Sequence, residues 1–179
     1  MLVPTVADES PCERITAMEL PRKKPNRLPD YDYSQNGAYF ITICTKDREH
    51  LLSRIVVGTS NARPPQICLT EVGRLAETAI REIPKRYPIA AVDHYVIMPN
   101  HIHMILRLDS ESGRPMVVPT VAKIVQQMKG WVTKQAGRPV WQSRYYDHVI
   151  RDDYDYMIKL RYIDENPANW LLKNDEYCE

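Results

Sequence analysis

The chain has 179 residues and a mass of 20.8 kDa, and its 44% hydrophobic and 26% charged residues are the composition of one globular domain. A formal net charge of +1 excludes a protein that is basic throughout, although a local basic surface is still compatible with it. No run of about 18 apolar residues and no apolar signal core are present, so we expect a cytoplasmic protein without a membrane span. Its four cysteines form no CxxC pair and indicate reduced thiols.

Residues 1–30 are predicted to form an extended arm that precedes a single domain over residues 31–179. Five of the fourteen prolines fall in this arm, and proline removes a backbone donor and interrupts helices. The arm also carries a basic cluster, made of Arg22, Lys23, Lys24 and Arg27. Two interpretations of this cluster are open: a solvated tail, or an arm that contacts phosphates.

The hydrophobic pattern predicts the order strand, helix, strand, strand, helix, strand, with one further helix. The predicted elements are a strand over 39–45, a short extended segment at 55–57 with a polar loop after it, a helix from Thr70 to 84–88, strands over 89–98 and 101–108, a helix from Thr120 to about Ala136, a strand over 145–150, and a helix from Asp152 or Asp153 to a stop at Asn166-Pro167. This order is typical of an α+β, ferredoxin-like βαββαβ sandwich, with two helices on one face of an antiparallel sheet.

Alternation along two predicted strands assigns side chains to the two faces of the sheet. In the strand over 101–108, the apolar set expected to face the two helices is Ile102, Met104, Leu106 and Leu108, and the set expected on the opposite face, where the last helix could pack, is His101, His103, Ile105 and Arg107. In the preceding strand, one face is predicted to carry Val92, His94, Val96 and Met98, and the other Asp93, Tyr95 and Ile97.

Two pairs of residues could carry chemistry. His101 and His103 point to one side of their strand, about 7 Å apart, so both imidazoles could bind one metal; hydrogen-bonded surface histidines are the alternative. Tyr162 and Asn166 share one face of the last helix, where a phenol could act as a nucleophile and an amide oxygen could bind a hard cation. A packing role for Tyr162 is the alternative, and four other tyrosines compete with it: Tyr145, Tyr146, Tyr154 and Tyr156.

A second candidate nucleic-acid surface lies on the helix that begins at Thr120. Residues 117–138 contain no acid, and their basic residues are Lys123, Lys129, Lys134 and Arg138. His148, on the predicted fourth strand, could position DNA or serve a structural role.

Several motifs in order resemble the REP-associated tyrosine transposases, a family of HUH single-strand DNA endonucleases. The segments that carry the resemblance are LPDYDY at 28–33, YFITICT at 39–45, YVIMPNHIH at 95–103, WQSRYYDHVIR at 141–151 and YIDENP at 162–167. The resemblance implies a ferredoxin-like core, a divalent metal, Mg²⁺ or Mn²⁺, on His101 and His103, and Tyr162 as the nucleophile. It also implies Asn166 as a third ligand, where related transposases commonly have Gln.

The function implied by the resemblance is metal-dependent cleavage and rejoining of single-stranded DNA at repetitive palindromic hairpins, through a 5′-phosphotyrosine and without a nucleotide cofactor. The basic arm, the basic helix and His148 would then contact DNA, and the protein would be nucleoid-associated, as a monomer or a homodimer. Three alternatives remain open: a DNA-binding regulator that no longer cuts, an insertion-sequence transposase that acts on its own ends, and an RNA-binding module of the same fold.

Overall fold

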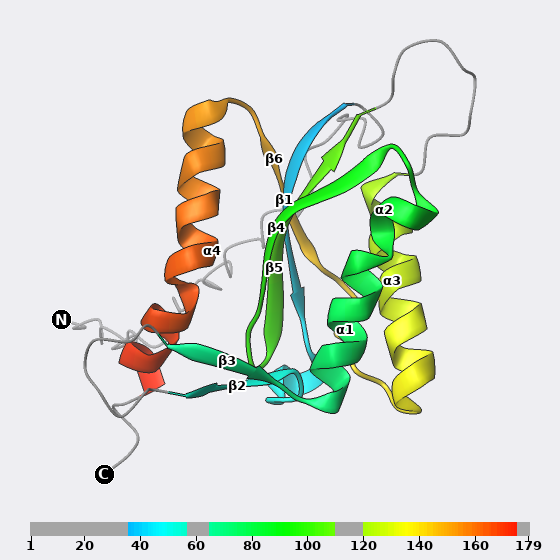
Figure 1. The fold of residues 1–179 in the computed structure, drawn as a ribbon. Helices are drawn as coiled ribbons and strands as arrows, with labels where there is room; N and C mark the ends of the chain where they lie inside the picture. The colour runs from blue at the N-terminus through cyan, green and yellow to red at the C-terminus, as the bar shows by residue number, and fades with distance from the viewer. Residues whose placement is uncertain (1–35, 57–64, 110–119, 175–179) are drawn as a thin grey trace, which may run out of the picture.

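A four-stranded antiparallel sheet organises the residues that the computed structural model describes, which are 36–56, 65–109 and 120–174. Its strand order is β4 (Ala90–Ile97), β5 (His101–Leu108), β1 (Gly37–Cys44) and β6 (Tyr146–Ile150) (Figure 1). Counted along the main sheet, this is the 4-1-3-2 order of the ferredoxin-like fold, so the predicted fold class is confirmed. The predicted N-terminal arm, with Arg22, Lys23, Lys24 and Arg27, lies outside the described residues.

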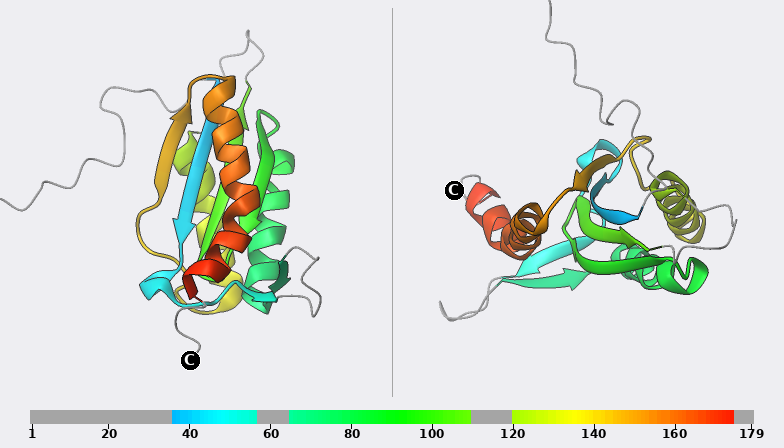
Figure 2. Two further views of the ribbon diagram at one scale, coloured as in Figure 1. Left: turned by 90° about the vertical axis from the view of Figure 1, so that its left-hand side faces the viewer. Right: turned by 90° about the horizontal axis from the view of Figure 1, so that it is seen from above.

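Helices cover both faces of this sheet. The helices α1 (Glu71–Arg81), α2 (Ile83–Arg86) and α3 (Val121–Ala136) lie on one face, and α4 (Asp153–Asn174) crosses the other (Figures 1 and 2). Each long helix begins at a polar cap predicted from the sequence: the side chains of Thr70, Thr120 and Asp152 accept backbone N–H bonds. No helix among the described residues is long and apolar enough to cross a membrane.

The predicted alternation of β5 is confirmed. Its helix-facing side chains join the larger apolar core between the sheet and α1 and α3, and they are Ile102, Met104, Leu106 and Leu108. On the opposite face, Ile105 packs with Phe40, Val96, Met98 and Ile163 in a smaller core beneath α4. His101 and His103 share this second face, so both imidazoles are covered by α4.

The prediction for β4 is wrong at Val92 and at Asp93, whose carboxylate accepts from Tyr156 of α4, because the strand contains a bulge. Val92 pairs with Leu106, whereas His94 pairs with Ile105, so the register shifts at Asp93. Such a bulge sets two residues against one on the partner strand. Val92 therefore belongs to the α1 and α3 side with the larger core, while His94 faces α4.

A second sheet was missed by the sequence prediction. The strands β2 (Ser53–Val56) and β3 (Gln66–Leu69) pair only with one another, antiparallel; β2 overlaps the predicted extended segment at 55–57, and β3 follows the stretch expected to be a polar loop. Each strand has four residues and is partly exposed, so the hydrophobic pattern indicates neither β3 nor the pairing of the two strands.

The predicted end of the last helix at Asn166-Pro167 is also wrong, because α4 continues to Asn174 with Pro167 inside it. Proline removes one intrahelical hydrogen bond, which commonly bends a helix, and the final turns of α4 lean away from the axis of its first turns (Figure 2). Tertiary contacts stabilise these turns: Trp170 packs against the smaller core, and its ring centroid lies 5.8 Å from that of His101.

Two helical glycines lead to opposite predictions for the same substitution. A Cβ on Gly73 of α1 would lie 1.9 Å from the carbonyl oxygen of Leu52, whereas a Cβ on Gly130 of α3 would meet nothing within 4 Å. Gly73→Ala should therefore lower the free energy of unfolding by about 1–3 kcal/mol, and Gly130→Ala should raise it by about 0.5–1 kcal/mol. Urea denaturation measures both, and equal effects would contradict the close packing of α1 on Leu52.

Candidate active site

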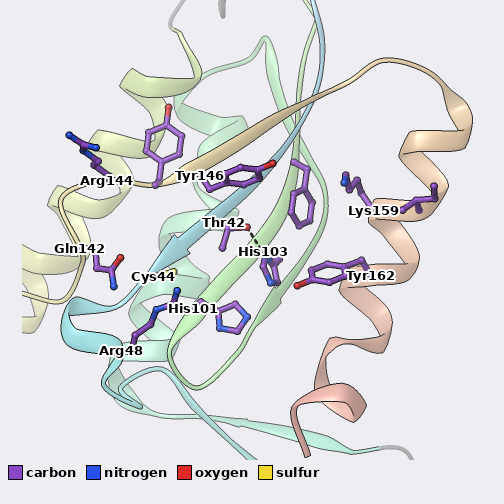
Figure 3. A pocket seen from close by; sticks show the side chains of 13 residues that line it. Thr42, Cys44, Arg48, His101, His103, Gln142, Arg144, Tyr146, Lys159 and Tyr162 are labelled. Carbon is purple, nitrogen blue, oxygen red and sulfur yellow. Dashed lines mark hydrogen bonds between the residues drawn. The ribbon is translucent and has the colours of Figure 1, made fainter. Parts of the chain in front are cut away.

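A cavity of about 570 Å³ opens between α4 and the sheet face that α4 covers (Figure 3). Strands β1 and β5, helix α4 and the connections next to the sheet all contribute side chains to it. The lining residues are Phe40, Thr42, Cys44, Arg48, His101, His103, Gln142, Arg144, Tyr145, Tyr146, Ile158, Lys159 and Tyr162. Three of these carry a permanent positive charge, and no carboxylate is among the described lining residues, so the cavity suits an anion.

His101 and His103 lie side by side in this cavity, with ring centroids 4.5 Å apart. They are only 7% and 5% exposed. The Nδ1–H of His101 donates to Asn100 Oδ1 at 2.7 Å, and Nδ1 of His103 lies 2.8 Å from Thr42 Oγ1, which can accept its proton. Both rings are thus oriented through Nδ1, so each Nε2 is directed to the other side, where His101 meets Asn166 and His103 has its lone pair free for another partner.

The Nε2 atom of His103 is buried and has no hydrogen-bond partner. A buried polar atom without a partner is costly, so a native protein usually has a use for one. Imidazole nitrogen next to a second imidazole and an amide is a donor set that divalent cations accept. The residues present therefore fit the metal that the resemblance implies, although among the described residues no cluster of three or more His, Cys, Asp or Glu side chains could hold one.

Burial keeps both imidazoles neutral. Burial is the largest cause and lowers the pKa of His101 to about 4. A hydrogen bond with Asn166 raises this pKa in part, and the nearby charge of Arg48 lowers it. Burial, followed by the charge of His101, lowers the pKa of His103 to about 3. Neutral imidazole is the form that binds a metal, so both side chains are in that form at physiological pH.

Helix α4 brings Tyr162 and Asn166 to the histidines from above. The Tyr162 ring centroid lies 5.1 Å from that of His103, and the hydroxyl points toward the two imidazoles (Figure 3). Tyr162 is 47% exposed, so its hydroxyl can be reached from solvent. Asn166, one turn later, is buried and hydrogen-bonds His101. The four predicted site residues, two on β5 and two on α4, are therefore together in a single chain.

The competing tyrosines have other surroundings. Tyr145 and Tyr146 line the cavity from the sheet side, at the start of β6. Tyr154 is fully on the surface in the first turn of α4, and the Tyr156 hydroxyl donates to Asp93 at 3.3 Å. Among the five candidates, Tyr162 has the placement that a nucleophile beside the histidine pair requires.

Two histidine–aspartate pairs hold α4 on the sheet. His148 Nε2 of β6 lies 2.7 Å from Asp155, and His94 Nε2 of β4 lies 2.7 Å from Asp164. They attach α4 at both sides of the sheet, near its start and again beside Tyr162. The predicted DNA-contacting residue His148 is thus placed as an anchor of α4, outside the cavity lining.

The basic face predicted on α3 lies on the opposite side of the sheet from the cavity (Figure 1). Lys123, Lys134 and Arg138 are exposed there. Lys129 is half-buried, and its ammonium donates to the carbonyls of Gln142 (2.7 Å) and Ser143 (3.1 Å), which ties α3 to the segment before β6. The structure does not bring these four residues to the histidine pair.

The sequence analysis missed the three cations that do line the cavity, Arg48, Arg144 and Lys159. Lys159 lies three residues before Tyr162, so helical spacing could have indicated it. Arg48 and Arg144 come from irregular connections, where no periodicity marks which side chains turn inward.

No family model matches the chain, but individual proteins and solved structures do. An uncharacterized protein of Haemophilus influenzae (strain Rd) is 32% identical over 164 residues, which covers 80% of this chain and 87% of that protein. Another protein of the same organism, named "Putative REP-associated tyrosine transposase", is 28% identical over 146 residues, 76% of this chain and 73% of its own length. A solved REP-associated tyrosine transposase bound to a REP hairpin matches with a TM-score of 0.59 and 23% identity, over 80% of this chain and 73% of that one.

The fold is that of a transposase, with a helix carrying a tyrosine over a pair of histidines on the central strand. The chain belongs to the same family as the 32% identical Haemophilus influenzae protein, and its fold is that of the REP-associated tyrosine transposases.

The buried imidazoles predict how stability depends on pH in the metal-free protein. Both folded-state pKa values, about 4 and about 3, lie below the ordinary value of 6.5, so the unfolded state binds more protons at acidic pH. The free energy of unfolding should be undiminished above pH 6.5 and fall as the pH drops toward 4, by roughly 3 kcal/mol per histidine. Urea titrations in a chelator should show a smaller fall for the His101→Gln/His103→Gln double variant; an identical fall would contradict the assignment.

Proposed function

We propose that the protein is a metal-dependent single-stranded DNA endonuclease and transesterase, which cleaves and rejoins DNA at repetitive palindromic hairpins. The observation that carries the proposal is that the Tyr162 ring lies 5.1 Å from the His103 ring, whose Nε2 has no partner, in a cavity that contains cations and no described carboxylate. A related transposase is bound to a REP hairpin in its solved structure, which supports hairpin DNA as the partner.

His101, His103 and Asn166 are the residues that would hold a divalent metal, Mg²⁺ or Mn²⁺. Such an ion neutralises charge on the non-bridging oxygens of a phosphate and makes phosphorus more open to attack. Asn100 and Thr42 contribute by orienting the two rings, since each occupies an Nδ1 atom. Trp170 packs against His101 and limits access of water to that side of the pair.

Tyr162 would act as the nucleophile. Its phenolic oxygen forms a bond to phosphorus while the bond from phosphorus to the 3′-oxygen breaks, so the products are a 5′-phosphotyrosine and a free 3′-OH. The phenolic proton leaves to solvent, to which Tyr162 is open, and the departing 3′-oxygen takes up a proton. One phosphodiester is exchanged for another, so rejoining by a 3′-OH needs no nucleotide cofactor.

One chain contains the histidine pair and the tyrosine, so a monomer suffices for this chemistry and a homodimer is not required by it. The cavity cations Arg48, Arg144 and Lys159 would contact DNA near the reacting phosphate. The exposed cations of α3 and the basic N-terminal cluster would bind more distant phosphates, which would make affinity fall steeply with salt.

Of the three alternative functions, the RNA-binding module fits this structure least well. An RNA-binding module of this fold needs an open sheet face on which bases can stack. Here α4 covers that face, and His101 and His103 on its central strand are buried. A non-cleaving DNA-binding protein and an insertion-sequence transposase that acts on its own ends share the fold, and they are distinguished by activity and by substrate.

The first test replaces the phenol. Tyr162→Phe should abolish the covalent protein–DNA adduct, because the attacking oxygen is removed, while affinity for a single-stranded repeat hairpin changes no more than about threefold. Adducts formed with Mg²⁺ or Mn²⁺ are counted on denaturing gels, and Tyr154→Phe and Tyr156→Phe serve as matched controls that should still form them. An adduct with Tyr162→Phe, or its loss in either control, would overturn the choice of nucleophile.

The second test measures the metal without cleavage. Mn²⁺ binding, followed by electron paramagnetic resonance, should weaken more than about 100-fold in His101→Gln and His103→Gln, because a directly coordinating nitrogen is lost. His148→Gln is the control, since His148 lies on the same sheet face but bonds Asp155. Equal Mn²⁺ affinity in all variants would remove the metal from the proposal.

A further inference from the structure

Arg48 enters the cavity from a backbone conformation that most side chains avoid. It ends the 3₁₀ turn η1 (Lys46–Arg48), which follows β1. Asp47 and Arg48 have φ angles of 52° and 58°, and among the described residues they are the two non-glycine positions with positive φ. This left-handed conformation is strained for a residue that carries a side chain. Surrounding contacts must therefore hold the turn in place.

Asn100, which orients His101, also supports this turn through Thr45. The buried hydroxyl of Thr45 donates to the carbonyls of Glu49 (2.8 Å) and Asn100 (3.0 Å), and Thr45 N–H donates to Asn100 as well. Asn100 in turn accepts the Nδ1–H of His101. Arg48 and His101 thus depend on a common support, which sets the position of the guanidinium relative to the imidazole pair.

The charge of Arg48 is not balanced within the described protein. Arg48 is exposed and forms no ion pair with a described residue, whereas Lys159 has Asp155 at 3.9 Å. The Arg48 guanidinium and the His101 ring lie on the same side of the cavity (Figure 3). A metal cation on the two histidines would repel the Arg48 guanidinium, and an anion bound between these two positive charges would remove that repulsion.

We propose that Arg48 is a further catalytic residue, which donates hydrogen bonds to the non-bridging oxygens of the phosphodiester that Tyr162 attacks. Arginine suits this role because its planar fork can bind two phosphate oxygens at once. It would stabilise the negative charge that grows on those oxygens as phosphorus becomes five-coordinate. This role rests on the proposed function, and the strained turn is then the structural cost of aiming the guanidinium at the phosphate.

The first experiment measures phosphate binding without cleavage. The probe is thymidylyl-thymidine, which has one phosphodiester, added with Mg²⁺ to Tyr162→Phe protein and followed by NMR of the His101 and His103 ring protons. Adding Arg48→Gln should weaken binding of the dinucleotide at least about tenfold. The affinity of the Arg48→Lys variant should lie between those of the parent and of Arg48→Gln. Arg54→Gln removes the same charge from β2, outside the cavity lining, and should bind as the parent does.

The second experiment separates this role from a structural one. Arg48→Gly removes the side chain and suits a positive φ, so it should melt no lower than the wild type while losing phosphate binding. Asp47→Gly relieves the same backbone strain at the residue before Arg48 and should still bind the phosphate probe. A lower melting temperature for Arg48→Gly would show that the guanidinium stabilises the fold, and would overturn the proposal.

The third measurement is the rate of adduct formation with a repeat hairpin in the wild-type background, where Arg48→Gln should be about 100–1000 times slower. Unchanged dinucleotide binding in Arg48→Gln overturns the role of Arg48 even if the wild type forms adduct. Lost dinucleotide binding in that variant, with no adduct from the wild type, would keep Arg48 as a phosphate-binding residue and refute the proposed cleavage instead.

Discussion

Two imidazoles buried beneath α4 must be held neutral and in fixed orientations, and the surrounding elements are arranged to do this. His101 and His103 occupy the face of β5 that α4 covers, and each Nδ1 has a partner on the sheet side. Their Nε2 atoms are consequently directed away from the strand, toward α4. Helix α4 must exclude water from these rings and still leave room for a ligand beside them. The cavity next to the smaller core provides that room.

The attachment of α4 reflects that double requirement. Few apolar residues connect it to the sheet, and paired polar contacts on either side add to them, such as His94 with Asp164 and His148 with Asp155. Hydrogen-bonded pairs hold a helix in one orientation with less apolar burial, which leaves Tyr162 open to solvent beside a buried pair of histidines. The strained turn at Arg48 follows the same pattern, in which local stability is given up at a site and supplied by surrounding contacts.

Much of the fold could be predicted because its elements have strong local periodicity. The strand His101–Leu108 alternates cleanly, and the caps at Thr70 and Thr120 are short-range signals, so faces and starts were correct. The failures have particular physical causes. A bulge at Asp93 is a pairing irregularity between two strands, and the continuation of α4 past Pro167 depends on a core that Trp170 reaches only after folding.

The candidate site divides in the same way. Local periodicity was enough to put the two histidines on one face of a strand, and Tyr162 and Asn166 on one face of a helix, because the side-chain period within an element is a property of the backbone. The folded chain was needed to show that these two faces meet, that the basic face of α3 lies elsewhere, and that Arg48 and Arg144 turn inward. Packing across a sheet and the path of an irregular connection are set by contacts between residues far apart in the chain, and no local pattern encodes them.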